Sequence, residues 1–138
     1  MKIIHVVGRS NSGKTTFIRK MIPELKQLGT VGVIKHLGDH PFALEDGKDT
    51  TLFYEAGADI TTGIDAEKTV CTFRGPDIDS VLKLYAENGI DFVLIEGYKQ
   101  RPYAKIVIGD LDIERSVLSN PTVGDVIGSL HLFDDFTG

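Results

Sequence analysis

Near its start the chain reads Gly8-Arg9-Ser10-Asn11-Ser12-Gly13-Lys14-Thr15, which fits the pattern G-x-x-x-x-G-K-[ST] of a phosphate-binding loop, or P-loop. An apolar run of strand length precedes it at residues 3–7. After it, large apolar side chains recur at helical spacing as far as Gly29, which predicts an amphipathic helix. A glycine-rich loop between a buried strand and a helix is the context in which this motif binds phosphates. We therefore predict a P-loop nucleotide-binding domain.

Each residue type in the loop has a chemical reason to be there. Gly8 and Gly13 let the backbone turn tightly, so that successive N–H groups point at phosphate oxygens, and the start of the following helix adds partial positive charge. Lys14 supplies a cation for the β and γ phosphates, Thr15 a hydroxyl ligand for Mg²⁺, and Thr16 a contact near the α phosphate. The predicted nucleotide-binding residues are Gly8, Arg9, Ser10, Asn11, Ser12, Gly13, Lys14, Thr15 and Thr16.

Outward from the loop, strand-length apolar runs alternate with helix-like segments, a pattern typical of an α/β domain with a largely parallel sheet flanked by helices. The runs rich in Thr, Val and Ile at residues 59–64 and 69–73 predict an added β-hairpin, and residues 35–48 a long surface loop. The other predicted strands are residues 3–7, 31–34, 92–95, 105–108 and 123–127, and the predicted helices are residues 15–28, 49–56, 78–87 and 130–136.

The composition favours one cytoplasmic globular domain. With 138 residues, 41% hydrophobic and 25% charged, the chain suffices for one core, so we predict a single domain over residues 1–138. The net charge of −5 argues against nucleic-acid and membrane-surface partners, which require clustered Lys and Arg. The apolar run before Gly8 is too short for a signal peptide or a membrane span. Cys71, the one cysteine, is expected to be a buried thiol.

A P-loop needs an acidic residue at the end of another strand, to hold the magnesium shell or to orient a nucleophile. Glu96 directly follows the apolar run at residues 92–95 and is predicted to fill this role. The alternative is a solvated carboxylate at a strand end. Asp49 is predicted either to cap the helix it begins or to take part in Mg²⁺ binding. The predicted catalytic residues are Lys14 and Glu96, and the predicted metal ligands are Thr15, Glu96 and Asp49.

Cationic side chains are predicted near the same edge of the sheet. Lys35 and His36 end the second strand, and ligands of open parallel sheets bind beyond the carboxyl ends of the strands. We expect Lys35 to contact an anion, with surface solvation as the alternative. His36 is expected either to contact a ligand or to form its hydrogen bonds within the protein at the strand end, and the sequence leaves both alternatives open. Lys99 and Arg101 place two cations just beyond Glu96, which favours a phosphorylated ligand or partner.

Three further polar residues have less specific expectations. Asp39 and His40 are expected either to add a metal or substrate contact from the loop or to belong to a polar surface. His5 lies within a predicted buried strand, so we expect it to pack in the core.

Four motifs occur in a characteristic order and spacing. They are the loop from Gly8 to Thr15, then Val33-Ile34-Lys35-His36, then Gly47-Lys48-Asp49-Thr50 with Ala56-Gly57-Ala58, then Leu94-Ile95-Glu96-Gly97-Tyr98-Lys99. Together they resemble the molybdopterin-guanine dinucleotide biosynthesis protein B (MobB) family, over roughly residues 2–109. The P-loop alone would indicate only the superfamily.

The resemblance implies a GTP-binding protein of molybdenum cofactor biosynthesis with weak Mg²⁺-dependent GTPase activity. It also implies a homodimer whose subunits share a sheet, and an adaptor for the partner enzyme that attaches GMP to molybdopterin. A preference for GTP over ATP follows from the resemblance alone, because the chain has no N-K-x-D element to read guanine. On this basis Lys14 and Thr15 bind GTP and Mg²⁺, Glu96 takes the Walker B position, and Lys35, His36, Asp49 and Lys99 line the site.

Two other functions fit a P-loop. A small-molecule kinase would transfer the γ-phosphoryl group to an acceptor held by the loop at residues 35–48, but it ordinarily needs a lid with arginines, and the arginines here are scattered. A metal-insertion GTPase would carry Cys and His at ligand spacing, whereas Cys71 is far from every histidine in the sequence.

Overall fold

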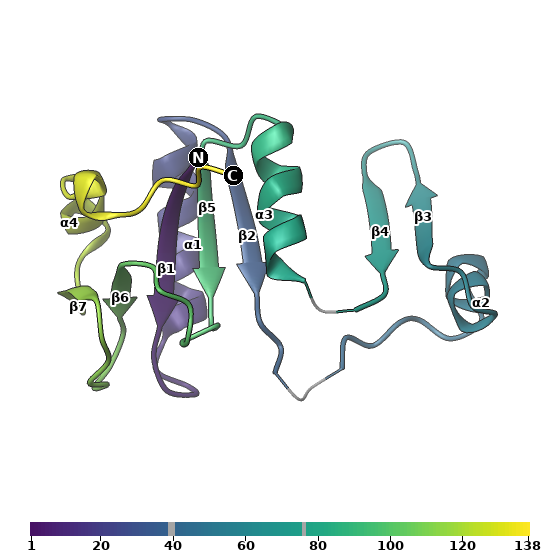
Figure 1. Ribbon diagram of the computed structural model, residues 1–138, viewed down its shortest axis with the longest axis horizontal. Helices are drawn as coiled ribbons and strands as arrows, with labels where there is room; N and C mark the ends of the chain where they lie inside the picture. The colour runs from purple at the N-terminus through teal and green to yellow at the C-terminus, as the bar shows by residue number, and fades with distance from the viewer. Residues whose placement is uncertain (39–40, 76) are drawn as a thin grey trace. The chain divides into compact units, whose positions relative to one another are not determined.

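The computed structural model describes residues 1–38, 41–75 and 77–138, and its chain divides into two compact units. The first unit joins Met1–Leu37 to Asp79–Gly138, and the second is Gly38–Ile78. Figure 1 shows the elements of both units. The single domain expected over residues 1–138 stays a prediction.

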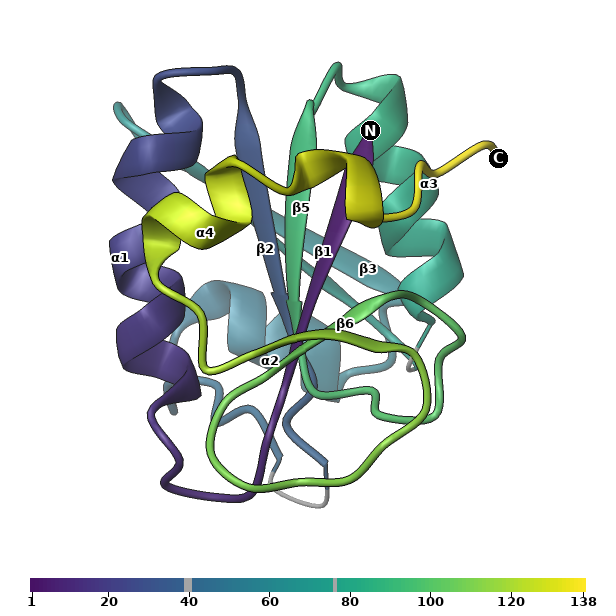
Figure 2. The ribbon, with the colours of Figure 1, turned by 90° about the vertical axis from the view of Figure 1, so that its left-hand side faces the viewer.

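The first unit is built on a parallel sheet, whose strands among the described residues follow the order β2-β5-β1-β6-β7. The helices α1 (Lys14–Lys26) and α3 (Ile78–Glu87) lie on opposite faces of this sheet (Figure 2). The expected α/β fold with flanking helices is thereby confirmed. The strands are β1 (Lys2–Val7), β2 (Val31–Lys35), β5 (Phe92–Glu96), β6 (Lys105–Val107) and β7 (Ser116–Ser119).

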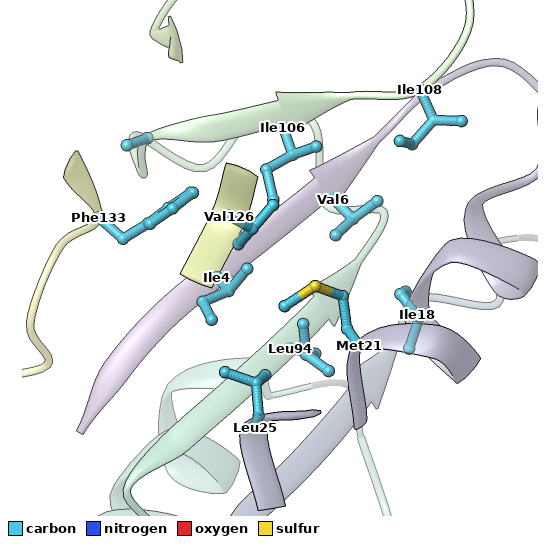
Figure 3. Close-up of a cluster of buried hydrophobic side chains, with 11 residues drawn as sticks. Ile4, Val6, Ile18, Met21, Leu25, Leu94, Ile106, Ile108, Val126 and Phe133 are labelled. Atoms are coloured by element: carbon cyan, nitrogen blue, oxygen red, sulfur yellow. The ribbon is translucent and has the colours of Figure 1, made fainter. Parts of the chain in front are cut away.

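The main core of this unit lies between the sheet and α1 (Figure 3). Ile4 and Val6 of β1 are fully buried there, because alternate side chains of a strand face the same layer. Met21 and Leu25 lie one helical turn apart on α1 and are also fully buried. Burying one such side chain contributes about 1.5–3 kcal/mol to folding. The central position of β1 fixes the place where the P-loop begins.

The C-terminal part of the sequence was predicted least well. Residues 123–127 were expected to be a strand but form the helix α4 (Val123–Ile127). The reason is a capping box, in which the Thr122 hydroxyl accepts a bond from the Asp125 N–H (3.1 Å) and the Asp125 carboxylate accepts one from the Thr122 N–H (2.9 Å). The helix expected at residues 130–136 is a short 3₁₀ turn, η1 (Leu130–Leu132), and β7 was not predicted.

The second unit contains the predicted β-hairpin and a short helix. Strands β3 (Ile60–Ile64) and β4 (Thr69–Phe73) pair antiparallel, and α2 (Asp49–Glu55) contacts β3. In the turn between the strands, the Asp65 carboxylate accepts bonds from the N–H groups of Glu67 (2.7 Å) and Lys68 (2.8 Å). The hydrogen bond from the Lys68 side chain and these N–H groups lower the pKa of Asp65. The hairpin prediction is confirmed.

Two expectations in this unit were wrong. Cys71 is exposed rather than buried. It pairs directly with Thr62 across the hairpin, on the face away from the buried Thr61, so no core covers it in this unit. Asp49 does not cap α2, because Lys48 is the N-cap residue and Asp49 is the first residue of the helix.

The described residues contain no helix that is both long enough and apolar enough to cross a membrane.

Candidate functional site

The carboxyl ends of the parallel strands meet at one edge of the first unit, and a cleft of about 560 Å³ opens there. This is the P-loop cleft. It is lined from three places: the loop after β1, the end of β2 and the end of β5. Its lining residues are Ser10, Asn11, Ser12, Gly13, Lys14, Thr15, Thr16, Lys35, His36, Glu96 and Gly97.

The loop backbone is held in a tight turn against the end of β6. Asn11 and Gly13 have positive φ values of 61° and 100°, the left-handed region that lets the backbone reverse. A Cβ added to Gly8 would lie 2.4 Å from the carbonyl oxygen of Ile108, so no larger residue fits there without a shift. The Ser12 hydroxyl is buried and has no hydrogen-bond partner among the described residues, which leaves it available to a ligand.

Lys14 and the start of α1 concentrate positive charge in the cleft. The Lys14 ammonium donates to the carbonyl oxygens of Gly8 (2.7 Å) and Arg9 (3.2 Å), which orient it without neutralising it. Gly13 is the N-cap of α1 and provides no side-chain cap, and the first turn has no acidic residue. The N–H groups and the dipole at this helix end are therefore free to attract an anion.

Glu96 and Lys35 face each other across neighbouring strands at the rim of the cleft. They are register partners of β5 and β2, and the Glu96 carboxylate lies 3.4 Å from the Lys35 ammonium. The Glu96 side chain is 12% exposed and that of Lys35 is 52% exposed. Lys35 can therefore move into solvent and free the carboxylate for a metal, while Glu96 stays fixed at the strand end.

The cleft fits a Mg²⁺ ion that arrives with phosphates rather than one held by protein alone. Thr15 and Glu96 both line the cleft and offer a hydroxyl and a carboxylate. Among the residues described, no group of three or more His, Cys, Asp or Glu could hold a metal ion. Since Mg²⁺ favours octahedral oxygen ligands, phosphate oxygens and waters would have to complete the shell.

The predicted site residues do not all line the same cleft. Most of the loop, with Lys35, His36 and Glu96, lines the P-loop cleft. Gly8 and Arg9 contribute carbonyl groups to Lys14 instead. Lys99 lines a neighbouring pocket, and Asp49 begins α2 in the second unit, where its proposed metal role stays a prediction. Asp39 and His40 lie outside the described residues.

Gly97 and Tyr98 were not among the predicted site residues, although they were part of a quoted motif. Gly97 lines the cleft with φ 91°, and a Cβ there would lie 2.9 Å from the Cβ of His36. The Tyr98 ring stacks on the His36 ring, with centroids 4.1 Å apart and planes at 14°. A glycine directly after a strand-end acid was the available signal, since such a glycine often marks a left-handed turn.

His5 supports this turn from inside the sheet. It is fully buried, as expected, and its Nε2 bonds to the Gly97 carbonyl oxygen. Burial lowers the pKa of His5 from 6.5 to about 4, outweighing the opposing effect of the Gly97 hydrogen bond, and the charge of Lys105 lowers it further. The ring is therefore neutral at pH 7, and Nε2 must carry the proton that it donates.

Comparison with known proteins gives one consistent family. The family profile described as "Molybdopterin guanine dinucleotide synthesis protein B" matches residues 3–128. A probable molybdopterin-guanine dinucleotide biosynthesis adapter protein of Bacillus subtilis (strain 168) is 41% identical over 110 residues, which cover 77% of this chain and 64% of that protein. The adapter protein of Haemophilus influenzae is 33% identical over 110 residues, covering 77% of this chain and 62% of its own length.

Solved structures agree with these sequence matches. The crystal structure of Bacillus subtilis MobB superposes with a TM-score of 0.69 at 34% identity, covering 86% of this chain and 77% of that one. A second structure of Bacillus subtilis MobB gives a TM-score of 0.67 at 26% identity, covering 97% and 99%. The chain spans less than two thirds of the length of the curated relatives named above.

Proposed function

Because the chain belongs to the molybdopterin guanine dinucleotide synthesis protein B family, we propose that it is an adaptor in molybdopterin-guanine dinucleotide biosynthesis and that its P-loop cleft binds GTP with Mg²⁺. The observation that carries the nucleotide proposal is the Lys14 ammonium, held by loop carbonyls at the start of α1. It faces a cleft with Glu96 on the rim.

In this proposal each group has one task. The N–H groups of the loop and of the first turn of α1 bind phosphate oxygens, and Lys14 neutralises their charge. Thr15 and Glu96 would hold Mg²⁺, and the half-exposed Lys35 would move aside from the Glu96 carboxylate. When bound, Mg²⁺ withdraws charge from the terminal phosphates.

Hydrolysis in such a site is slow. The cationic side chains among the described lining residues are Lys14 and Lys35, and no arginine is among them. Arginines that neutralise transition-state charge raise phosphoryl-transfer rates by about 10³–10⁵-fold where they occur. A bound nucleotide would therefore persist and could signal to, or be passed to, the partner enzyme that attaches GMP to molybdopterin. The same observation disfavours the small-molecule kinase.

We also propose a homodimer formed through the second unit. Residues directly opposite in an antiparallel pair share a face, so Ile60 and Phe73 lie with Ile64 and Cys71 on one face of the hairpin. This open face exposes Ile60 (55%), Ile64 (77%) and Phe73 (51%). Large exposed apolar side chains gathered on one face are typical of an interaction surface.

Calorimetry with GTP and with ATP, each with and without Mg²⁺, tests the nucleotide proposal. The wild-type protein should bind GTP in preference to ATP, with affinity that rises when Mg²⁺ is present and with slow phosphate release. Lys14→Ala should abolish binding, whereas Lys20→Ala, an exposed lysine on the same helix, should not change it. Retained affinity in the Lys14 variant would refute the assignment of the cleft, and ATP preference would favour the kinase.

A further inference from the structure

A second pocket of about 610 Å³ adjoins the P-loop cleft and shares His36 and Gly97 with it. We call it the Tyr98 pocket. It belongs entirely to the first unit and is formed by the end of β2 and the segment that follows β5. Its lining residues are His36, Gly97, Tyr98, Lys99, Gln100 and Arg101.

Two buried polar side chains hold the segment that forms this pocket through hydrogen bonds to its backbone carbonyls. His5 of β1 bonds to the Gly97 carbonyl, and the Lys105 ammonium of β6 donates to the carbonyls of Tyr103 (2.8 Å) and Arg101. His5 and Lys105 are register partners with 0% and 3% exposure. Burying an ammonium group is costly unless it is well bonded, so this arrangement holds the segment in one conformation.

The aromatic wall of the pocket is held in an unfavourable backbone conformation. Tyr98 has a φ of 52°, which few non-glycine residues adopt and which is unusual for a bulky side chain. Its ring nonetheless stacks in parallel on the His36 ring. Such local strain persists only where the surroundings enforce it, and it is frequent at ligand sites. Aromatic rings in a pocket wall bind planar ring systems by stacking.

The charge of the pocket comes from Lys99. The Arg101 guanidinium is paired with the Asp79 carboxylate through two contacts of 3.1 Å, so its charge is largely balanced. Lys99 is exposed and forms no ion pair within the described part of the chain. One unbalanced cation beside an aromatic wall favours a ligand that has both a ring and a negative charge.

We propose that the Tyr98 pocket is a second small-molecule site, which binds a planar heteroaromatic ring bearing an anionic group next to the P-loop cleft. The preformed segment lowers the entropy that binding would otherwise lose. The identity of the neighbouring ligand, a nucleotide, and the choice of a pterin as the ring both rest on the proposed function. A pterin is the planar heteroaromatic ring named in the description of the family, and pterin-6-carboxylate supplies the anionic group.

The test is titration of pterin-6-carboxylate into the whole chain, followed by pterin fluorescence and calorimetry. Stacking and charge predict that Tyr98→Asn weakens binding at least about tenfold and Lys99→Met about fivefold. Asn tolerates the left-handed backbone at position 98, and Tyr98→Phe, which keeps the ring, should bind as the wild type does. Lys83→Met on α3 is the matched control for the lost charge. Circular dichroism checks that each variant is folded.

Two comparisons separate this proposal from the nucleotide proposal. Lys14→Ala should leave pterin-6-carboxylate binding unchanged, and neutral 6-hydroxymethylpterin and cyclohexanecarboxylate should both bind more weakly. The inference is overturned if pterin-6-carboxylate does not bind, if the Tyr98 and Lys99 variants bind it as the wild type does, or if Lys14→Ala abolishes its binding. GTP binding without pterin binding leaves the nucleotide proposal intact, and pterin binding without GTP binding refutes only the nucleotide proposal.

Discussion

At the scale of single residues, the Glu96 carboxylate in the P-loop cleft is paired with the Lys35 ammonium, which can move away into solvent. The pair is 3.4 Å apart, and the ammonium side is half-exposed. Pairs of this kind stabilise a fold by only about 0–1 kcal/mol, so a metal can replace the lysine at small cost. Both residues were predicted from the sequence, because the carboxyl ends of parallel strands share an edge.

We expect Glu96→Gln to retain GTP binding within about threefold and to lose at least about tenfold in Mg²⁺-dependent phosphate release, because a neutral amide orients the metal shell poorly. Calorimetry and a phosphate-release assay measure the two effects. Glu87→Gln at the end of α3 is the matched control. Unchanged release in the Glu96 variant would mean that its carboxylate is only a strand-end solvated group.

The titration of His5 is expected to make the free energy of unfolding depend on pH. Its pKa is about 4 in the folded chain and 6.5 when unfolded, so the unfolded chain binds more protons between these values. Stability should be full above pH 6.5 and fall by up to roughly 3 kcal/mol as the pH drops to 4. Urea unfolding from pH 7 to pH 4 measures this. His5→Gln, which keeps a donor for Gly97 but does not titrate, should show a shallower slope, and equal slopes would contradict the assignment.

Gly97 and Tyr98 show where sequence reasoning ends at this scale. The P-loop could be predicted because its chemistry is local and its residues are consecutive. The roles of Gly97 and Tyr98 depend on His36 and His5, which are distant in sequence and meet them only in the folded sheet. No periodicity or spacing in the segment after Glu96 encodes that contact.

At the scale of elements, most helices and strands were predicted, and the errors lie in the C-terminal part of the chain, at β7, α4 and η1. The helix α1 and the strands β1, β2 and β5 have long apolar patterns that match one period. In α4, the apolar positions Val123, Val126 and Ile127 do not distinguish a strand from a helix, and the deciding signal is the Thr122–Asp125 capping box. Strand β7 has only a brief apolar run, Val117-Leu118, between exposed serines.

Thr122→Ala should destabilise the protein by about 1 kcal/mol, because it leaves the first N–H groups of α4 without an acceptor. Val126 of this helix is fully buried against the core, so loosening the helix affects the whole first unit. The midpoint of urea unfolding measures the change. Thr122→Ser keeps the hydroxyl and should restore most of the lost stability; if both variants behave alike, the capping box does not hold the helix.

At the scale of the whole molecule, the open face of the hairpin exposes large apolar side chains that nothing in the described part of the second unit covers. Sequence reasoning predicted the hairpin but placed Cys71 in a core, because it could not tell that only one face packs on α2. Thr61 on the packed face is 7% exposed, whereas Ile64 on the open face is 77% exposed. In the proposed homodimer, the interface would therefore be formed by side chains that contribute little to the isolated unit.

The double variant Ile64→Arg with Phe73→Arg should be monomeric at concentrations where the wild type is a dimer, since it places charges on the open face. Light scattering after size-exclusion chromatography measures the mass. Leu84→Arg is the control, because Leu84 is 43% exposed on α3 and lies outside the hairpin. A dimer that survives the double variant must use another surface, and a monomeric wild type would refute the dimer.

The two ends of the chain lie together at the amino end of β1. Figure 1 shows the two termini near each other at this end of β1. The Phe136 N–H donates to the Met1 carbonyl (2.8 Å), and Lys2 forms an isolated antiparallel β-bridge with Asp135. The P-loop starts at the other end of β1, about 20 Å away for a strand of this length. An affinity tag or a tether to a sensor surface, attached at either terminus, would therefore extend from the side of the protein opposite both pockets. The chain can then be immobilised without obstructing them.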